Sequence, residues 1–159
     1  MNMARPSAPK TGAMMKAYYS TTLDPLAGVN VLLGEIGDLT VSGLGREGVE
    51  LKYRGSGYIK ELPGLKSLRE VEMEVIYGMN PTLDAFLEEA MESAEIFLLK
   101  IMDGDITESG SAGLVMPVFI KEMDWKQSIS EVSSRTVKCV NTYAVNDGEE
   151  LNPQWLEIA

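Results

Sequence analysis

The sequence has 159 residues, enough for one domain with a buried core, and its 45% hydrophobic content is ordinary for a globular protein. Its 24 acidic and 14 basic residues give a net charge of −10, which argues against adhesion to nucleic acid, since such binding depends on cationic contacts to phosphates. Histidine is absent and Cys139 is the single cysteine, so the commonest general base and an internal disulfide are excluded.

Residues 1–22 show no helical or strand period and mix Pro6, Pro9 and Gly12 with polar residues and methionines. We expect an N-terminal arm that a neighbouring subunit holds in place. No continuous apolar run follows its positive charges, so a signal peptide is not expected. No stretch of the chain approaches the ~20 apolar residues that a membrane helix needs.

A first strand is predicted over 37–42, followed by the glycine-rich stretch 43–48. That stretch, GLGREG, matches the G-x-G-x-x-G pattern of dinucleotide-binding proteins. The fingerprint requires a helix next, whose N-terminus holds the pyrophosphate. The residues that follow alternate like a strand, so we interpret 43–48 as a strand connection and expect no cofactor.

The region 49–77 predicts two alternating strands, 49–54 and 69–77, joined by a long loop. In the second strand one face is apolar, with Val71, Met73, Val75 and Tyr77. The other face carries Glu70, Glu72 and Glu74. This period of two is typical of a strand with one buried and one polar face.

The loop 54–68 is too long for a simple hairpin turn, and long connections in compact domains are usually functional or disordered. Tyr58, Leu62 and Leu65 lie in it with no evident core face. Large apolar and aromatic side chains in such a place favour a protein interface.

A helix is predicted from Asn80-Pro81, because Asn caps free backbone donors and Pro suits the first helical position. Its apolar residues recur at helical spacing, and its acids lie largely off that stripe. The stripe comprises Leu83, Phe86, Leu87, Ala90, Met91 and Ala94. The pattern predicts one amphipathic helix packed on a sheet.

The apolar run 96–102 predicts a central strand buried on both faces, and 103–113 a loop. Asp103, Asp105 and Thr107 resemble the start of a calcium loop, but the glycine and glutamate that an EF-hand needs further on are missing, which favours a solvated loop. A long strand is predicted over 114–127.

Pro117 suggests a bulge or an edge position in this long strand, and Trp125 is predicted to lie in the core. A last strand is predicted over 135–143. The element order, strands then one helix then strands, indicates a mainly β fold: an antiparallel sandwich or barrel with one flanking helix. We divide the chain into an arm (1–34), a β domain (35–143) and a C-terminal tail (144–159).

No motif for nucleophilic catalysis or phosphate binding occurs, and no pair of carboxylates is set in opposed environments. We therefore expect no catalytic residue, no cofactor and no metal site. An acidic sheet face beside a long contact loop favours a structural protein over an enzyme.

The stretch 37–43 (GDLTVSG), the alternating strand after it, and a loop ending in 62–65 (LPGL) together resemble the major tail protein, or tail tube protein, of tailed bacteriophages. The continuation agrees: an alternating strand, one amphipathic helix near 80–95, an apolar strand, and paired strands later. The resemblance covers roughly residues 35–143.

The resemblance implies a β-sandwich whose hexameric rings stack into a hollow tube, with the long loop reaching the next ring. Carried to this chain, the ring-stacking residues are Arg54, Tyr58, Lys60, Leu62, Leu65 and Lys66. The candidates for facing the lumen are Glu70, Glu72 and Glu74. DNA would pass through the lumen without specific binding, because a negative wall repels its backbone.

The resemblance further implies self-association, contacts with other tail proteins such as a tape measure and a terminator, and a place in the virion tail after assembly in the host cytoplasm. Contractile and non-contractile tails are not separated by it. The alternatives are a tail-terminator or head–tail completion protein, and an acidic soluble β-barrel binding module.

Overall fold

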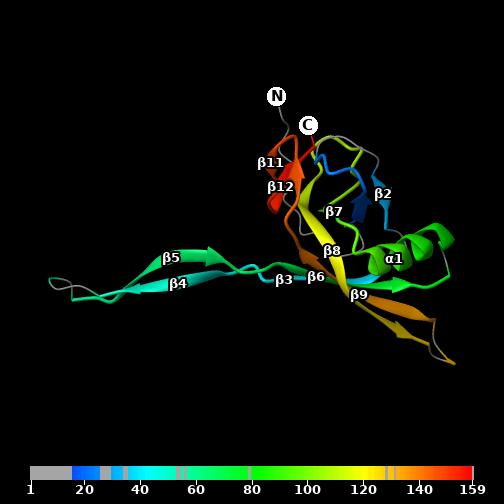
Figure 1. Cartoon of the computed structure of the whole chain (residues 1–159), viewed down its shortest axis with the longest axis horizontal. Helices are drawn as coiled ribbons and strands as arrows, with labels where there is room; N and C mark the ends of the chain where they lie inside the picture. Colours follow the sequence, from blue (N-terminus) through cyan, green and yellow to red (C-terminus); the bar gives the residue numbers. More distant parts are fainter. Residues whose placement is uncertain are drawn as a thin grey trace.

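The computed structural model describes residues 16–25, 30–33, 36–52, 55, 57–78, 80–127, 129–130 and 132–158. Within these residues, one eight-stranded antiparallel sheet carries a single helix on one face, and a long two-stranded hairpin projects from its side (Figure 1). The strands are β1 (Lys16–Ser20), β2 (Val31–Leu32), β3 (Ile36–Ser42), β4 (Arg46–Leu51), β5 (Lys60–Lys66), β6 (Glu70–Ile76), β7 (Phe97–Met102), β8 (Ala112–Lys126), β9 (Ser134–Asn141), β10 (Val145–Asn146), β11 (Glu149–Glu150) and β12 (Gln154–Glu157). The helix is α1 (Pro81–Ser93).

The main sheet runs in the order β2-β1-β7-β8-β9-β6-β3, and β12 pairs with β8 beside β9. The sheet does not close into a barrel, and its two end strands are β2 and β3. The prediction of a mainly β, sandwich-like antiparallel fold with one flanking helix is confirmed.

Helix α1 begins where the sequence indicates. The Asn80 side-chain oxygen accepts a hydrogen bond from the Leu83 backbone N–H, and Pro81 occupies the first helical position. The helix ends at Ala94, whose left-handed backbone (φ 52°) stops it and whose N–H donates to the Ala90 carbonyl. Leu83, Leu87 and Ala90 are buried against the sheet, so the predicted amphipathic helix is confirmed, although Ala94 is exposed.

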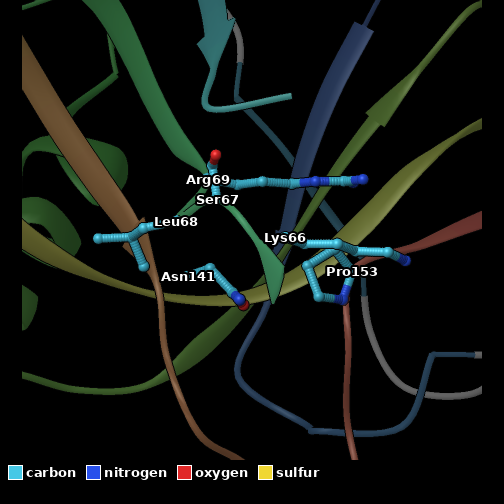
Figure 2. Close-up of a pocket in the computed structure, with 6 residues that line it drawn as sticks. All are labelled: Lys66, Ser67, Leu68, Arg69, Asn141 and Pro153. Carbon is cyan, nitrogen blue, oxygen red and sulfur yellow. The ribbon is translucent and has the colours of Figure 1, made fainter. Parts of the chain in front are cut away.

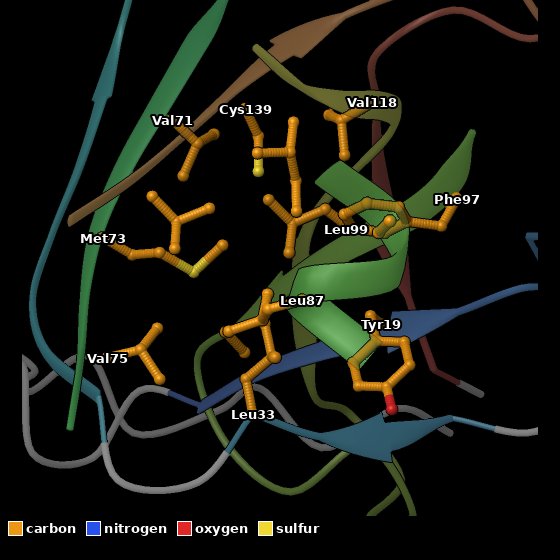
Figure 3. Packing of buried hydrophobic residues seen from close by; sticks show 14 of the residues in the cluster. Tyr19, Leu33, Val71, Met73, Val75, Leu87, Phe97, Leu99, Val118 and Cys139 are labelled. Atoms are coloured by element: carbon orange, nitrogen blue, oxygen red, sulfur yellow. The ribbon is translucent and has the colours of Figure 1, made fainter. Parts of the chain in front are cut away.

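The core lies between α1 and one face of the sheet (Figure 3). Strand β6 follows its predicted alternation, with Val71, Met73 and Val75 buried. Strand β7, an inner strand between β1 and β8, is buried along its whole length, as the apolar run predicts: Phe97, Leu99 and Ile101 belong to the core, and Lys100 on the other face donates to the Pro25 carbonyl. Fully burying each such aliphatic side chain contributes about 1.5–3 kcal/mol to stability.

Three aromatic rings fix the helix to the sheet. The Tyr19 ring stacks on Phe86 of α1 with centroids 4.0 Å apart, and both rings meet Phe97 of β7 edge to face. Such pairs add about 0.5–1.5 kcal/mol beyond the area that they bury. Burial also raises the pKa of the Tyr19 hydroxyl.

The prediction that residues 1–22 contain no strand is wrong for Lys16–Ser20, which form β1. Strand β1 pairs with β2 and β7, and Ala17 and Tyr19 belong to the core. Strand β1 has five residues, and both of its faces are buried. Its side chains therefore do not alternate between apolar and polar, and the sequence shows no period that would mark the strand. Residues 1–15 of the expected arm lie outside the described residues, and the contact of the arm (1–34 in our division of the chain) with a neighbouring subunit stays a prediction.

The C-terminal segment also joins the sheet, through β12 on β8. Pro117 lies at the point of β8 where the partner changes: β12 pairs up to Val115, and β9 pairs from Val118. This local edge tolerates a residue without a backbone N–H. The register shift in β8 lies between Ile120 and Glu122, so the strand's bulge is not at Pro117.

The predicted structureless loop 54–68 is wrong in its second half, because Lys60–Lys66 forms β5 and pairs with β4 as a hairpin. Pro63 and Gly64 within KELPGLK hid the strand from the pattern, since both are poor strand residues. The predicted strand 49–54 likewise begins earlier, at Arg46.

Candidate assembly surfaces

The β4–β5 hairpin continues the β3–β6 pair outward from the body. Ser42 pairs with Glu70 at the end of β3, and after a short break the Ser67 N–H donates to the Gly45 carbonyl at 2.9 Å. Gly43 allows this break: its φ is +76°, and a Cβ there would lie 1.9 Å from the Leu68 carbonyl oxygen. The ribbon therefore leaves the sheet at one fixed point.

The hairpin exposes large apolar side chains. Tyr58 and Leu65 are each 81% exposed, and the directly paired Val49 and Leu62 are also exposed. A two-stranded hairpin without a layer on its face is marginally stable in water. An exposed apolar ribbon of this kind is a surface for another chain.

Most of the predicted ring-stacking residues lie on this ribbon. Leu62, Leu65, Lys60 and Lys66 belong to β5 and are exposed, and Tyr58 lies just before it. Arg54 lies outside the described residues. The structure thus places five of the six on one projecting element, and their contacts with another ring remain a prediction.

Charges along the hairpin are mixed. Lys52 pairs with Glu50 at 3.5 Å, and the Arg46 guanidinium donates to the Gly64 carbonyl at 3.0 Å. Exposed pairs of this kind contribute little to stability, about 0–1 kcal/mol. The apolar side chains, not these ion pairs, distinguish the surface.

A second surface is the outward side of β3, β6, β9 and the far half of β8, which we call the acidic face. The strand register aligns Thr40, Glu72, Lys138 and Glu122 in one row across the four strands. The next row holds Glu74, Thr136 and Asp124. Glu72 and Glu74 are exposed and Glu70 is half-buried, so the three predicted glutamates share this face.

Lys138 offsets part of the charge on the acidic face. Its ammonium lies 3.7 Å from the Glu122 carboxylate and is also paired in register with Glu72. Glu70, Glu74 and Asp124 remain beside it as further carboxylates. The face is therefore a mainly acidic and polar sheet surface.

A pocket of about 280 Å³ lies at the base of the hairpin, where β5 ends and the chain enters β6 (Figure 2). We call it the hairpin-base pocket. The residues that line it are Lys66, Ser67, Leu68, Arg69, Asn141 and Pro153. Three separate segments of the chain meet there, and two of them are joined by the hydrogen bond that the Asn141 N–H donates to the Arg69 carbonyl at 3.0 Å.

Sequence reasoning missed a cation–aromatic clamp at the far end of the sheet. The buried Arg135 guanidinium lies 3.9 Å from the centroid of the Trp125 ring and 5.0 Å from that of Tyr77. It also pairs with Glu88 of α1 at 3.4 Å and donates to the Asp84 carbonyl. Trp125 is 43% exposed, so its predicted place in the core is wrong: the ring covers an arginine at the edge of the body.

The structure also reveals a second projection that the sequence did not indicate. Strand β8 ends at Lys126, which pairs with Ser134 of β9, and in the turn beyond this pair Ile129 is fully exposed and Val132 is 68% exposed. We call Ile129, Ser130 and Val132 the β8–β9 tip. Isolated apolar residues among serines carry no period, so no sequence signal marked them.

The loop 103–111 does not gather a metal site in the described part of the chain, where no group of three or more potential ligands occurs. The Asp105 carboxylate accepts hydrogen bonds from the Thr107 N–H and hydroxyl, and these bonds lower its pKa. Its second oxygen lies 4.0 Å from the Lys16 ammonium. These contacts fit the predicted solvated loop.

Lys100 is a buried cation on the face of β7 opposite to Phe97, Leu99 and Ile101. The Lys100 ammonium is buried and donates to the Pro25 carbonyl at 3.2 Å. Burial lowers its pKa, and the nearby Asp24 carboxylate partly opposes that shift.

Among the described residues no helix is long and apolar enough to cross a membrane.

The fold is that of several solved tail structures. A chain of the SPP1 tail tube superposes with a TM-score of 0.66 at 10% identity, covering 95% of this chain and 81% of the other. A chain from the tail of an empty gene transfer agent particle, solved with C6 symmetry, gives 0.64 at 14% identity, covering 86% and 96%.

A chain of the sheath-tube complex of an extracellular contractile injection system gives a TM-score of 0.55 at 11% identity and covers 96% of this chain and 94% of the other. No protein-family model matches the sequence, and no curated protein matches it. The similarity therefore lies in the fold, and at these identities almost none of it lies in the residues.

Proposed function

We propose that this protein is the subunit of a tail tube, in which rings of six copies stack into a hollow cylinder. The observation that carries the proposal is the β4–β5 hairpin: a two-stranded ribbon with exposed apolar side chains that projects from a body with the fold of tail tube chains. Its exposed side chains give each ring a contact with the next.

The acidic face fits the wall of the lumen. A sheet surface bearing Glu70, Glu72 and Glu74 repels the phosphate backbone, so DNA passes through without binding. At physiological salt, charges act over about 8 Å, so only the carboxylates that line the channel matter. In the row of Thr40, Glu72, Lys138 and Glu122, only Lys138 carries a positive charge.

In this function the protein is structural, works in the virion tail and is assembled in the host cytoplasm. Its principal partner is a second copy of itself, and a tape measure and a terminator protein are the expected partners at the core and end of the tube. It requires no catalytic residue and no cofactor.

Electron microscopy of the purified protein tests the proposal. We expect six-fold rings that stack into tubes with a regular helical rise. Single rings that never stack would favour a tail-terminator or head–tail completion role instead. A stable monomer at high concentration would contradict both and favour a soluble binding module.

A pair of matched variants tests the role of the hairpin. We expect Tyr58→Ser with Leu62→Ser to give a folded protein that does not stack, because it removes the exposed apolar side chains. The control, Tyr143→Ser with Val145→Ser, changes side chains of similar exposure outside the hairpin and should leave tubes intact. Tubes of normal length from the hairpin variant would show that stacking uses another surface.

A further inference from the structure

The two projections of the molecule lie at opposite ends of its longest dimension. The β4–β5 hairpin extends to one side of the body, and the β8–β9 ribbon extends to the other (Figure 1). When identical copies stack head to tail, opposite ends of consecutive copies meet. When the hairpin of one copy lies along the next copy, the β8–β9 tip of that next copy approaches the base of the hairpin.

The β8–β9 tip is built as a contact element. Ile129 is fully exposed and Val132 is 68% exposed, on a ribbon whose last paired residues are Lys126 and Ser134. The clamp of Arg135 between Trp125 and Tyr77, tied to Glu88 of α1, fixes the ribbon to the body just before the tip. The apolar residues are thus presented on a rigid support, which lowers the entropy cost of a contact.

The hairpin-base pocket has the size and the lining for an aliphatic side chain. Its volume of about 280 Å³ exceeds that of a cavity of about 150 Å³ that can hold benzene. Leu68 and Pro153 supply apolar surface, and the methylene chains of Lys66 and Arg69 can add to it. Leu68 is 55% exposed in a single copy, although it borders the pocket.

We infer that the β8–β9 tip of one copy docks in the hairpin-base pocket of the next copy along the stack, with Ile129 against Leu68 and Pro153. This contact rests on the proposed tube and adds a second stacking element to the hairpin. It is heterologous, since tip and pocket are different surfaces, so it propagates from ring to ring.

Disulfide trapping tests the contact. Cys139 is the single native cysteine and is fully buried, so cysteines placed at exposed sites react without background. In assembled protein carrying Ile129→Cys and Leu68→Cys, we expect mild oxidation to give a ladder of covalent multimers on a non-reducing gel. Each single-cysteine variant should give at most dimers.

The matched control combines Ile129→Cys with Thr82→Cys. Thr82 is exposed at the start of α1, and α1 begins near the same end of the molecule as the β8–β9 ribbon (Figure 1). Head-to-tail stacking keeps these two cysteines apart, so we expect no ladder. Tubes that form normally but give no ladder with Leu68→Cys would overturn the docking and leave the tube function standing. Absence of rings and tubes in the unmodified protein would instead overturn the function.

Substitutions at the tip give an independent readout. We expect Ile129→Ser to shorten tubes or raise the protein concentration needed for assembly several-fold, and Ile129→Leu to restore native behaviour because it keeps the aliphatic surface. Unchanged assembly of Ile129→Ser would contradict the docking.

Discussion

The β6 strand of the body and the β4 strand of the hairpin carry the same kind of alternating pattern, with opposite outcomes. In β6 the apolar residues Val71, Met73 and Val75 are fully buried beneath α1. In the hairpin Val49 and Leu62 face each other in register and stay exposed. Alternation therefore reports that a strand has two different faces, and the presence of a covering layer decides whether the apolar face is buried within one chain or left for another.

The difference divides the molecule by task. The body obtains its stability from burial under α1 and from the aromatic contacts of Tyr19, Phe86 and Phe97. The hairpin contributes little to that core and depends on the continuous ladder from β3 and β6 for its position. Substitutions in the two regions should accordingly affect different measurements.

The largest effect on the free energy of unfolding is expected in the core. Phe97→Ala should destabilise the protein by about 3–5 kcal/mol, because it leaves a cavity among β1, β7 and α1. Its neighbour Ile96 is 36% exposed, and Ile96→Ala should cost much less. Chemical denaturation of unassembled protein measures both, and equal losses would show that the core is not centred on Phe97.

The buried thiol of Cys139 should make stability fall at alkaline pH. Burial raises its pKa from 9.0 to about 12. Between these values the unfolded thiol loses its proton while the folded one keeps it, so the folded state binds more protons and the free energy of unfolding falls as pH rises. The free energy of unfolding should fall by about 1.4 kcal/mol per pH unit, and by about 4 kcal/mol in total.

Comparison with Cys139→Ala isolates this slope. The lowered pKa of Lys100 acts in the opposite direction, because below the ordinary lysine pKa the unfolded chain binds the proton more readily. The difference between native protein and variant removes that contribution. The free energies of unfolding of native protein and variant, measured by denaturation from pH 8.5 to the highest accessible pH, should approach each other as pH rises. A constant difference between them would mean that the thiol is not protected by burial.

A smaller effect is expected at the edge of the body. Trp125→Ala should cost about 1–2 kcal/mol, since it removes the ring 3.9 Å from the Arg135 guanidinium. Trp155 is 71% exposed, and Trp155→Ala should leave the free energy of unfolding nearly unchanged. Thermal unfolding of the two variants compares a clamped and an exposed tryptophan, and a reversed order would refute the clamp.

The smallest effect on stability belongs to the hairpin. The Tyr58→Ser, Leu62→Ser variant should change the free energy of unfolding by no more than about 0.5 kcal/mol, because both side chains are exposed. The same variant is expected to abolish stacking. A loss of stability as large as that of a core variant would mean that the hairpin packs on its own body.

Much of the fold could be predicted from residues 70–102. The alternation of β6, the Asn80-Pro81 start of α1 and the apolar run of β7 each specify their element locally. Strand β1 could not be found in this way, because a strand buried on both faces shows no period and Tyr18 and Tyr19 stand in a short segment. Strand β5 was hidden by Pro63 and Gly64.

The candidate surfaces were predicted unequally. Tyr58, Leu62 and Leu65 stood out because large apolar residues lacked a core face, and the structure leaves them exposed. Ile129 gave no signal, since one apolar residue in a serine-rich turn is common. The hairpin-base pocket was beyond prediction because its residues come from three distant segments.

The sequence by itself determined the faces of β6, the cap and stripe of α1 and the acidic balance of the chain, because these depend on neighbours within a few positions. Tertiary structure alone decided which apolar faces are covered, how the glutamates of β6 align with Thr40, Lys138 and Glu122, and that the two ribbons point to opposite ends. Burial and register are set by contacts between residues far apart in the chain, and a one-dimensional pattern does not contain them.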